Sequence, residues 1–170
     1  DFSKGMFALA DAHGCELVGG DTTQGSLNIC ITVLGEVPVV AGKSQALLRS
    51  GAQVGDDIYV SGNLGDARLA LEVFRGQQQV PAEVFAHARL RMEQPTPRVA
   101  LGQALRGIAS AAIDVSDGFL GDLGHVLRAS GVGARIDLGR LPTSRTLADH
   151  FEEAARWPLQ LSGGADYELC

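Results

Sequence analysis

The chain has 170 residues, with 20 acidic residues against 14 lysines and arginines, so its formal net charge is −6. This balance argues against binding nucleic-acid phosphates or an anionic membrane surface, because both favour clustered basic residues. Apolar residues make up 45% of the chain and charged residues 20%, which is typical of a globular protein and excludes a wholly disordered one. The length predicts one domain or two small halves.

The three cysteines, Cys15, Cys30 and Cys170, are scattered and form no CxxC pair. They therefore predict neither a disulfide framework nor a structural zinc site, and they favour a reducing, cytoplasmic location. No apolar stretch approaches the roughly 20 residues that a membrane helix needs. Both ends resemble cut ends, because Asp1 is not a start methionine and the apolar stretch reaching Cys170 stops without a turn. We expect a fragment.

The first part of the chain predicts a helix over 2–13, a short strand over 16–20 and a long strand over 27–37. In the long strand apolar and polar residues alternate, and Ile, Val and Thr are frequent. Glycines and a proline interrupt residues 38–55, which indicates a connecting segment. We place a domain boundary there, with domains at 1–40 and 41–170. Within this connection Gly42-Lys43-Ser44 lacks the earlier glycine of a phosphate loop, because Val37 stands in its place. It predicts an ordinary turn.

The remainder alternates strands with helices. Helical spacing predicts helices over 66–75, 82–91, 99–106, 119–129 and 144–156, and Gly131 is the expected stop after the fourth. Strands are expected over 58–61, 111–115, 134–138 and after the glycine pair at 163–164. This alternation predicts an α/β (α+β) fold in which a mixed sheet is covered by helices.

Gly19-Gly20-Asp21-Thr22-Thr23 follows the first predicted strand directly. Two glycines let the backbone turn sharply and bring its N–H groups close to phosphate oxygens. Asp21 beside them could hold Mg²⁺, which binds carboxylates and substrate phosphates while keeping several waters. A hairpin turn with local side-chain hydrogen bonds explains the same residues equally simply.

Asp114-Val115-Ser116-Asp117-Gly118 stands where a strand ends and a helix begins. In open α/β sheets ligands bind at such strand ends, and free N–H groups beyond an N-cap such as Ser116 favour an anion. The alternative is that Ser116 and Asp117 only cap the helix and complement its dipole. A charged Asp114 on an apolar strand is harder to explain structurally, because an unpaired buried charge is costly.

Ser162-Gly163-Gly164-Ala165-Asp166 repeats the pattern of a glycine pair, an aspartate and a strand. Arg49 could bind a phosphate through two hydrogen bonds, although a single arginine is more often a solvated surface group.

Taken in order, GGDTT, LLRSGAQVGDDIYVSG, GDA, the Pro-x-Pro-Arg segment, AIDVSDG and SGGADYELC resemble the thiamine-monophosphate kinase family. Single motifs are shared with the wider aminoimidazole-ribonucleotide-synthetase superfamily, whereas the combination of AIDVSDG with a late SGGxDYEL is closer to the kinase. The resemblance covers essentially the whole chain. It implies the end of an N-terminal α/β domain, which forms a homodimer in the family, joined to most of a C-terminal α/β domain.

The resemblance implies transfer of the ATP γ-phosphoryl group to thiamine monophosphate, giving thiamine diphosphate, with several Mg²⁺ ions. The positions that match ATP contacts in the family are Gly20, Asp21, Arg49 and Ser116. Those that match Mg²⁺ ligands are Asp21, Asp114 and Asp117. No catalytic nucleophile is implied, because such a transfer depends on positioning and on metal neutralisation of the phosphate oxygens.

One position departs from the family. The late motif usually reads SGGEDYEL and its Glu contacts substrate, whereas this chain has Ala165 there, so its substrate-binding residue is unknown. The fragment alone is expected to be inactive. Two other functions remain open: another ATP-using enzyme of the superfamily with a different acceptor, and a non-catalytic nucleotide-binding or dimerisation module.

Overall fold

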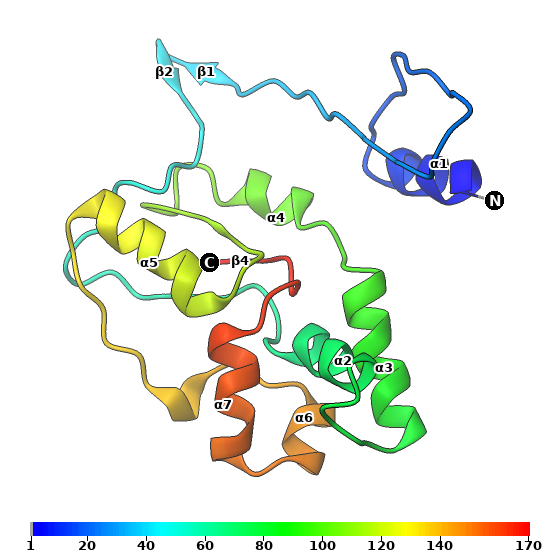
Figure 1. Ribbon diagram of the computed structural model, residues 1–170. Helices are drawn as coiled ribbons and strands as arrows, with labels where there is room; N and C mark the ends of the chain where they lie inside the picture. The colour runs from blue at the N-terminus through cyan, green and yellow to red at the C-terminus, as the bar shows by residue number, and fades with distance from the viewer. Residues whose placement is uncertain (1) are drawn as a thin grey trace. The chain divides into compact units, whose positions relative to one another are not determined.

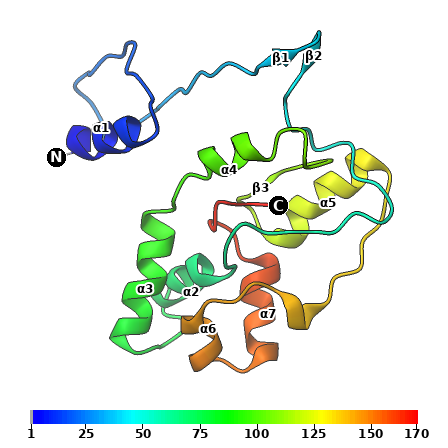
Figure 2. The ribbon, with the colours of Figure 1, turned by 180° about the vertical axis from the view of Figure 1, so that it is seen from behind.

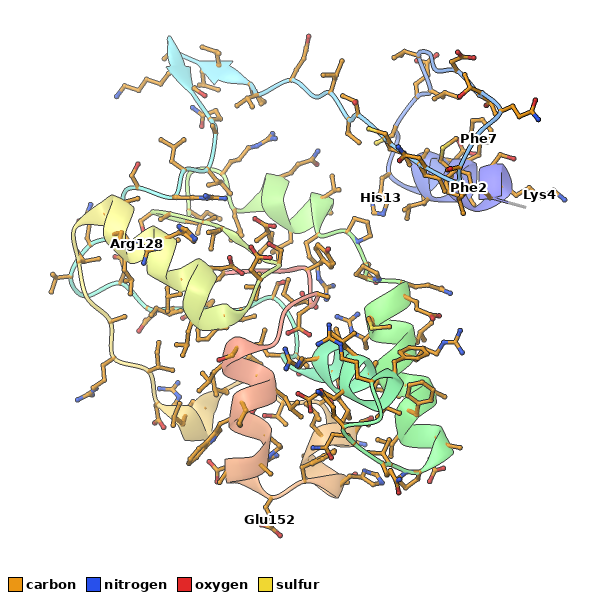
Figure 3. The ribbon with its side chains drawn as sticks, in the orientation of Figure 1. Phe2, Lys4, Phe7, His13, Arg128 and Glu152 are labelled. Carbon is orange, nitrogen blue, oxygen red and sulfur yellow. The ribbon has the colours of Figure 1, made fainter. Side chains whose placement is uncertain are left out.

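The computed structural model describes residues 2–170 and divides into two compact units, one ending at Val37 and the other spanning Pro38–Cys170. The first unit contains helix α1 (Phe2–Ala12), which confirms the first predicted helix (Figure 1). Phe2 and Phe7 on this helix are exposed, and both are labelled in Figure 3. The rest of the unit, residues 13–37, has neither helix nor strand.

The predicted strands over 16–20 and 27–37 are therefore wrong. Their apolar side chains are exposed, with Leu27 at 92% and Leu34 at 84%. A strand is stabilised by hydrogen bonds to a neighbouring strand, and residues 2–170 place no partner beside these segments. An alternating pattern indicates which side chains would share a face of a strand, but it does not indicate which other strand would pair with it.

The second unit begins with a hairpin of β1 (Val39–Val40) and β2 (Lys43–Ser44). The two residues that connect these strands, Ala41 and Gly42, both have positive φ, at 48° and 77°. Positive φ at both central positions is the geometry of a tight hairpin turn. Gly42 therefore lies in an ordinary turn, as predicted, whereas Lys43 and Ser44, which were expected in the same turn, form strand β2.

Three predicted helices follow as α2 (Asp66–Phe74), α3 (Ala82–Glu93) and α4 (Val99–Ala104). Helix α2 packs along α3 (Figure 1). A buried cluster joins these two helices to later parts of the chain through Leu69, Ala70, Val84, Ala88, Leu147 and Leu159. Fully burying a leucine or valine side chain contributes about 1.5–3 kcal/mol, so this cluster stabilises the helical end of the unit.

Helix α5 (Phe119–Ser130) ends at Gly131, whose φ of 69° lies in the left-handed region, as predicted. The predicted strand over 134–138 is wrong, because this segment is an unpaired connection leading to the short helix η1 (Leu138–Arg140). The predicted helix over 144–156 is two helices, α6 (Arg145–His150) and α7 (Glu153–Ser162). The chain becomes extended at Phe151 between them, and Glu152 marks this break in Figure 3.

The central strands are β3 (Asp114–Val115) and β4 (Glu168–Leu169), which pair antiparallel with Val115 opposite Glu168. Helix α5 lies against β3, as the reverse view in Figure 2 shows. Leu64, Val115, Phe119, Leu123 and Leu141 form the second buried cluster there. Ser61 donates its N–H to the Leu169 carbonyl, so the predicted strand over 58–61 runs beside β4 without forming a regular strand.

Helices and strands together confirm the α/β (α+β) class. Within residues 2–170 the strands form two sheets of two strands each, and both pairs are antiparallel, so the predicted mixed sheet is not formed there. None of the helices between residues 2 and 170 combines the length and apolar character needed to cross a membrane.

Candidate functional site

The two acidic glycine loops of the second unit lie against each other. Ala165 donates its N–H to the Ser116 carbonyl at 2.8 Å, and Tyr167 donates to the Val115 carbonyl at 2.9 Å. These bonds continue the β3–β4 pairing beyond the strands themselves. Two motifs that are separated by more than forty residues in the sequence therefore form one contiguous surface.

Two glycines make this close approach possible. A Cβ atom added to Gly164 would lie 2.6 Å from the Ser116 carbonyl oxygen, and one added to Gly118 would lie 3.0 Å from the Ser162 backbone. Gly118 also has a φ of 127°, which side-chain-bearing residues rarely adopt. Both positions need glycine, because any side chain would push the two loops apart.

The Gly-Asp-Ala motif at 65–67 joins the same surface through Asp166. The Asp166 carboxylate is 3% exposed and accepts the Gly65 N–H at 3.0 Å at the start of α2. The pKa of Asp166 is raised to about 7, mainly by burial and to a smaller extent by the neighbouring Asp66. Hydrogen bonds from the N–H groups of Gly65 and Ala67 and the charge of Arg91 oppose this rise. Asp166 thus links the late glycine loop to α2.

Asp66 is itself buried, and its Oδ1 accepts a hydrogen bond from the Ser144 hydroxyl at 2.7 Å. Burial raises the pKa of Asp66, while the hydrogen bond from Ser144 and the charges of His87 and Arg91 oppose that rise. Sequence reasoning did not single out Asp66 or Ser144, because nothing in the local pattern shows that a helix-start aspartate meets a second helix start.

Asp114 and Asp117 are exposed, and among residues 2–170 neither carboxylate has a hydrogen-bond or ion-pair partner. Carboxylate oxygens with free lone pairs suit Mg²⁺, which binds one or two of them and retains several waters. The two residues therefore fit a Mg²⁺ site. Three or more metal-ligating side chains do not gather anywhere in the described part of the chain.

Ser116 does not act as the N-cap that its position suggests. The N-cap of α5 is Gly118, which makes no side-chain capping bond. The N–H groups of Ser116, Asp117 and Gly118 instead donate to Oδ2 of the buried Asp122, at 2.9, 3.0 and 3.2 Å. The N–H groups of these three residues are therefore occupied by the chain's own carboxylate and do not bind an anion, and the ATP contact of Ser116 stays a prediction.

Asp122 is a residue that sequence reasoning missed. The sequence did contain a signal for it, because Asp122 stands in the first turn of the predicted helix. An aspartate there can accept hydrogen bonds from the backbone N–H groups that precede the helix. By accepting three of them, it shapes the loop from which Asp114 and Asp117 project.

Arg49 is exposed, and its backbone carbonyl accepts a hydrogen bond from the Ser130 hydroxyl at 3.3 Å. The same hydroxyl accepts the N–H groups of Gly51 and Ala52 at 3.2 and 3.1 Å. The end of α5 thereby positions the Arg49 segment. Among residues 2–170 the guanidinium has no ion-pair partner and so remains available to an anion.

Gly20 and Asp21 lie in an exposed loop of the first unit. Gly20 has a φ of 154°, and Asp21 Oδ1 accepts the Thr22 N–H at 2.7 Å. This hydrogen bond joins neighbouring residues, and it leaves the other carboxylate oxygen without a partner among residues 2–170.

A buried ion cluster lies behind the surface formed by the two loops. Glu168 is 1% exposed and accepts hydrogen bonds from Arg98 at 2.6 and 2.7 Å, from Arg91 at 2.7 Å and from the Ser61 hydroxyl at 2.5 Å. Burial alone would raise the pKa of Glu168, but the hydrogen bonds from Arg98 and Ser61 hold that pKa below its ordinary value. Two guanidinium groups share one carboxylate, so the cluster has a surplus of one positive charge.

A cavity of about 380 Å³ opens beside this cluster. It is lined by residues 95–98, Gly102, Asp114, Tyr167 and Leu169. The candidate metal ligand Asp114 therefore borders a space of the size that small-molecule sites commonly have, about 300–1,000 Å³.

Fold and site together define a member of a known domain class. Residues 53–156 match the family described as AIR synthase related protein, C-terminal domain. Because the match covers more than half of the chain, this chain belongs to that family.

Relatives of known function indicate which enzymes the chain is similar to. The chain is 49% identical over 172 residues to the thiamine-monophosphate kinase of Salmonella typhimurium, covering 99% of this chain and 51% of that protein. A solved thiamine-monophosphate kinase from Stenotrophomonas maltophilia K279a is 42% identical with a TM-score of 0.82, covering 99% of this chain and 54% of that one. A structure described as AaThiL complexed with AMPPCP and TMP is 33% identical with a TM-score of 0.64. The match covers 72% of this chain and 40% of that one. The chain spans about half the length of the curated relatives it matches.

Proposed function

We propose that the protein containing this chain transfers the γ-phosphoryl group of ATP to thiamine monophosphate and forms thiamine diphosphate, with Mg²⁺. The observation that carries the proposal is the surface formed by the loops 114–118 and 163–166. It presents the carboxylates of Asp114 and Asp117, which have no partner among residues 2–170, and Asp114 borders a cavity. Similarity to thiamine-monophosphate kinases along 99% of the chain supports the choice of reaction.

Phosphoryl transfer between two phosphate groups needs little covalent chemistry from the protein. It needs alignment of donor and acceptor and neutralisation of the charge on their oxygens. Asp114 and Asp117 would hold Mg²⁺, and the bound ion supplies that neutralisation. Asp21 is proposed as a further Mg²⁺ ligand from the first unit.

Four residues are proposed to contact ATP. Arg49 can bind phosphate oxygens through two parallel N–H groups, and the end of α5 holds its backbone in place. Gly20 and Asp21 supply a loop whose backbone can approach phosphates, and Ser116 offers its hydroxyl beside the two metal-binding carboxylates. These assignments rest on the family resemblance together with the exposed or half-buried positions of the residues.

We also propose that the protein works in the cytoplasm, where ATP is available, and as a homodimer, as in the family that the chain resembles. Three cysteines without a disulfide agree with a reducing compartment.

A second enzymatic function is favoured by one residue. Ala165 stands where the resemblance implies a substrate-binding glutamate, and its φ of 69° places it in the left-handed region. An ATP-using enzyme with a different acceptor phosphate is therefore the alternative. Measuring which acceptor stimulates ADP release separates the two.

The test uses the longest reading frame that contains this chain, alongside the 170-residue chain itself. Each is incubated with ATP, Mg²⁺ and thiamine monophosphate, and thiamine diphosphate is detected by chromatography. We expect product from the longer protein only. Absence of product from it at saturating ATP and Mg²⁺ overturns the kinase proposal. ADP release with another acceptor would then support the alternative, and Mg·ATP binding without turnover would indicate a non-catalytic module.

A further inference from the structure

The hydroxyl of Ser130, at the end of α5, makes all its hydrogen bonds to one turn of the chain, residues 49–52. A serine hydroxyl has one donor and two acceptor positions. It donates to the Arg49 carbonyl at 3.3 Å and accepts the N–H groups of Gly51 and Ala52 at 3.2 and 3.1 Å. A serine inside a helix more commonly points to solvent or bonds the carbonyl four residues earlier. Here the three bonds reach across 78 to 81 positions of sequence to the segment that follows β2 (Figure 1).

The same turn is held on its other side by the segment that leads into β3. The Ala112 N–H donates to the Leu48 carbonyl at 2.9 Å. Gly51 has a φ of 126°, and any side chain on it would overlap the Ser110 carbonyl. The turn is therefore fixed between the end of α5 and the chain just before Asp114.

Arg49 combines a fixed backbone with a free side chain. Its carbonyl is bound by Ser130, whereas its guanidinium is exposed and has no ion-pair partner among residues 2–170. Fixing the backbone of a binding residue before the ligand arrives reduces the conformational freedom that is lost on binding. A displacement of about 1 Å in such a group can weaken its effect strongly. The hydroxyl of Ser130 is thus placed to control where the Arg49 side chain starts.

We propose that Ser130 is a positioning residue for phosphate binding: its hydroxyl holds the Arg49 turn against the segment leading to Asp114. The phosphate-binding guanidinium and the candidate Mg²⁺ ligand thereby keep one relative arrangement. Ser130 itself contacts no substrate and acts through Arg49. The inference rests on the proposed function, in which Arg49 contacts ATP.

The experiment measures the dissociation constant of Mg·ATP by calorimetry in the longest reading frame that contains this chain. Ser130→Ala removes three hydrogen bonds from the turn. We expect about fivefold weaker binding, within the range of roughly 2- to 150-fold for coupled residues in contact. Ser130→Thr retains the hydroxyl and should bind Mg·ATP within about twofold of the parent. The KM for thiamine monophosphate should stay within about twofold in both variants, because Arg49 is proposed to contact ATP only.

A double-mutant cycle with Arg49→Ala separates positioning from general stabilisation. If Ser130 acts through the guanidinium, adding Ser130→Ala to Arg49→Ala changes the Mg·ATP affinity by less than about twofold. A serine that only stabilised the fold would weaken binding by the same factor in both backgrounds.

The matched control is Thr143→Ala. It removes a half-buried hydroxyl that donates to the Leu141 carbonyl at 2.9 Å and accepts from Gln160 at 2.8 Å. The control therefore loses structural hydrogen bonds of the same kind, away from the Arg49 turn, and should bind Mg·ATP like the parent.

The outcomes separate the two proposals. If the parent forms thiamine diphosphate and Ser130→Ala binds Mg·ATP within about twofold of it, the positioning role is overturned and the kinase stands. An equal loss in the Arg49→Ala background, or an unchanged affinity of Arg49→Ala itself, also overturns it. If the parent binds Mg·ATP but forms no product, the kinase proposal fails, and the four dissociation constants of the cycle still decide the role of Ser130. A parent that does not bind Mg·ATP overturns both.

Discussion

Arg98 and Glu168 lie 70 positions apart in the chain and form a two-point ion pair, with Arg98 Nε and Nη2 donating to the two carboxylate oxygens at 2.7 and 2.6 Å. This pair ties the segment before α4 to the central strand β4. Arg98 also lines the cavity that the candidate metal ligand Asp114 borders.

Removing the carboxylate should destabilise the protein. Glu168→Ala leaves two arginines without their partner, and breaking a buried ion pair from one side costs about 3–5 kcal/mol. The Arg98 and Arg91 side chains are 28% and 24% exposed, so water offsets part of that cost and we expect about 3 kcal/mol. Urea denaturation measures the loss of unfolding free energy. The control is Glu93→Ala, which removes an exposed pair with Arg89 and should change stability by less than about 1 kcal/mol. Equal effects of the two substitutions would contradict a special role for Glu168.

Asp166 predicts a particular pH dependence of stability. Its folded-state pKa of about 7 lies above its ordinary value of 3.8, so the folded protein binds more protons than the unfolded chain between these limits. The contribution of Asp166 is fully present below about pH 4 and is lost as pH rises through 7. Asp166→Asn stays uncharged and retains an acceptor for the Gly65 N–H. The difference in unfolding free energy, parent minus variant, should therefore fall from pH 4 to pH 7.5 in urea titrations. A difference that rises with pH would mean that the Asp166 carboxylate is stabilised in its charged form.

Asp122 is not a candidate ligand, but we expect it to hold the loop 116–118 in place. Asp122→Ala leaves three backbone N–H groups without their acceptor, and a hydrogen bond to a charged group contributes about 1.5–3 kcal/mol. We expect a loss of about 3 kcal/mol together with faster amide hydrogen exchange at residues 116–118. Asp137→Ala, which removes a single backbone hydrogen bond to Gly139, is the control. Unchanged exchange at 116–118 would show that Asp122 does not hold this loop.

The nucleotide assignments predict a loss of Mg·ATP affinity. Asp21→Asn and Asp114→Asn each retain the side-chain shape but remove the charge that attracts Mg²⁺, and we expect about tenfold weaker binding, or roughly 1.4 kcal/mol. Calorimetry with the longest reading frame measures it. Asp149→Asn, at an exposed position of α6, should bind Mg·ATP like the parent. If neither Asp21→Asn nor Asp114→Asn changes the affinity, these two loops do not bind the nucleotide.

Local signals predicted much of this chain because their causes are local. Helical spacing located α2 and α3, and Gly131 ended α5 since a left-handed residue closes a helix most easily as glycine. The position of Asp114 in the last part of a strand and that of Asp117 just beyond it were also visible in the sequence. Whether all these aspartates bind ligands remains a prediction.

What only the tertiary structure decided depends on contacts between distant segments. The alternating residues 27–37 do not form a strand, because a strand exists only where another backbone accepts and donates its hydrogen bonds. Asp122 occupies the N–H groups that were expected to bind an anion, a choice between two acceptors that sequence cannot rank. The pairing of β3 with β4 then brings Ser116 against Ala165 and places Tyr167 beside Asp114. The sequence by itself determined the helices up to Gly131 and the acidic loops, but not the break between α6 and α7. Long-range hydrogen bonding and burial decided which of those loops meet and which carboxylates have no partner among residues 2–170.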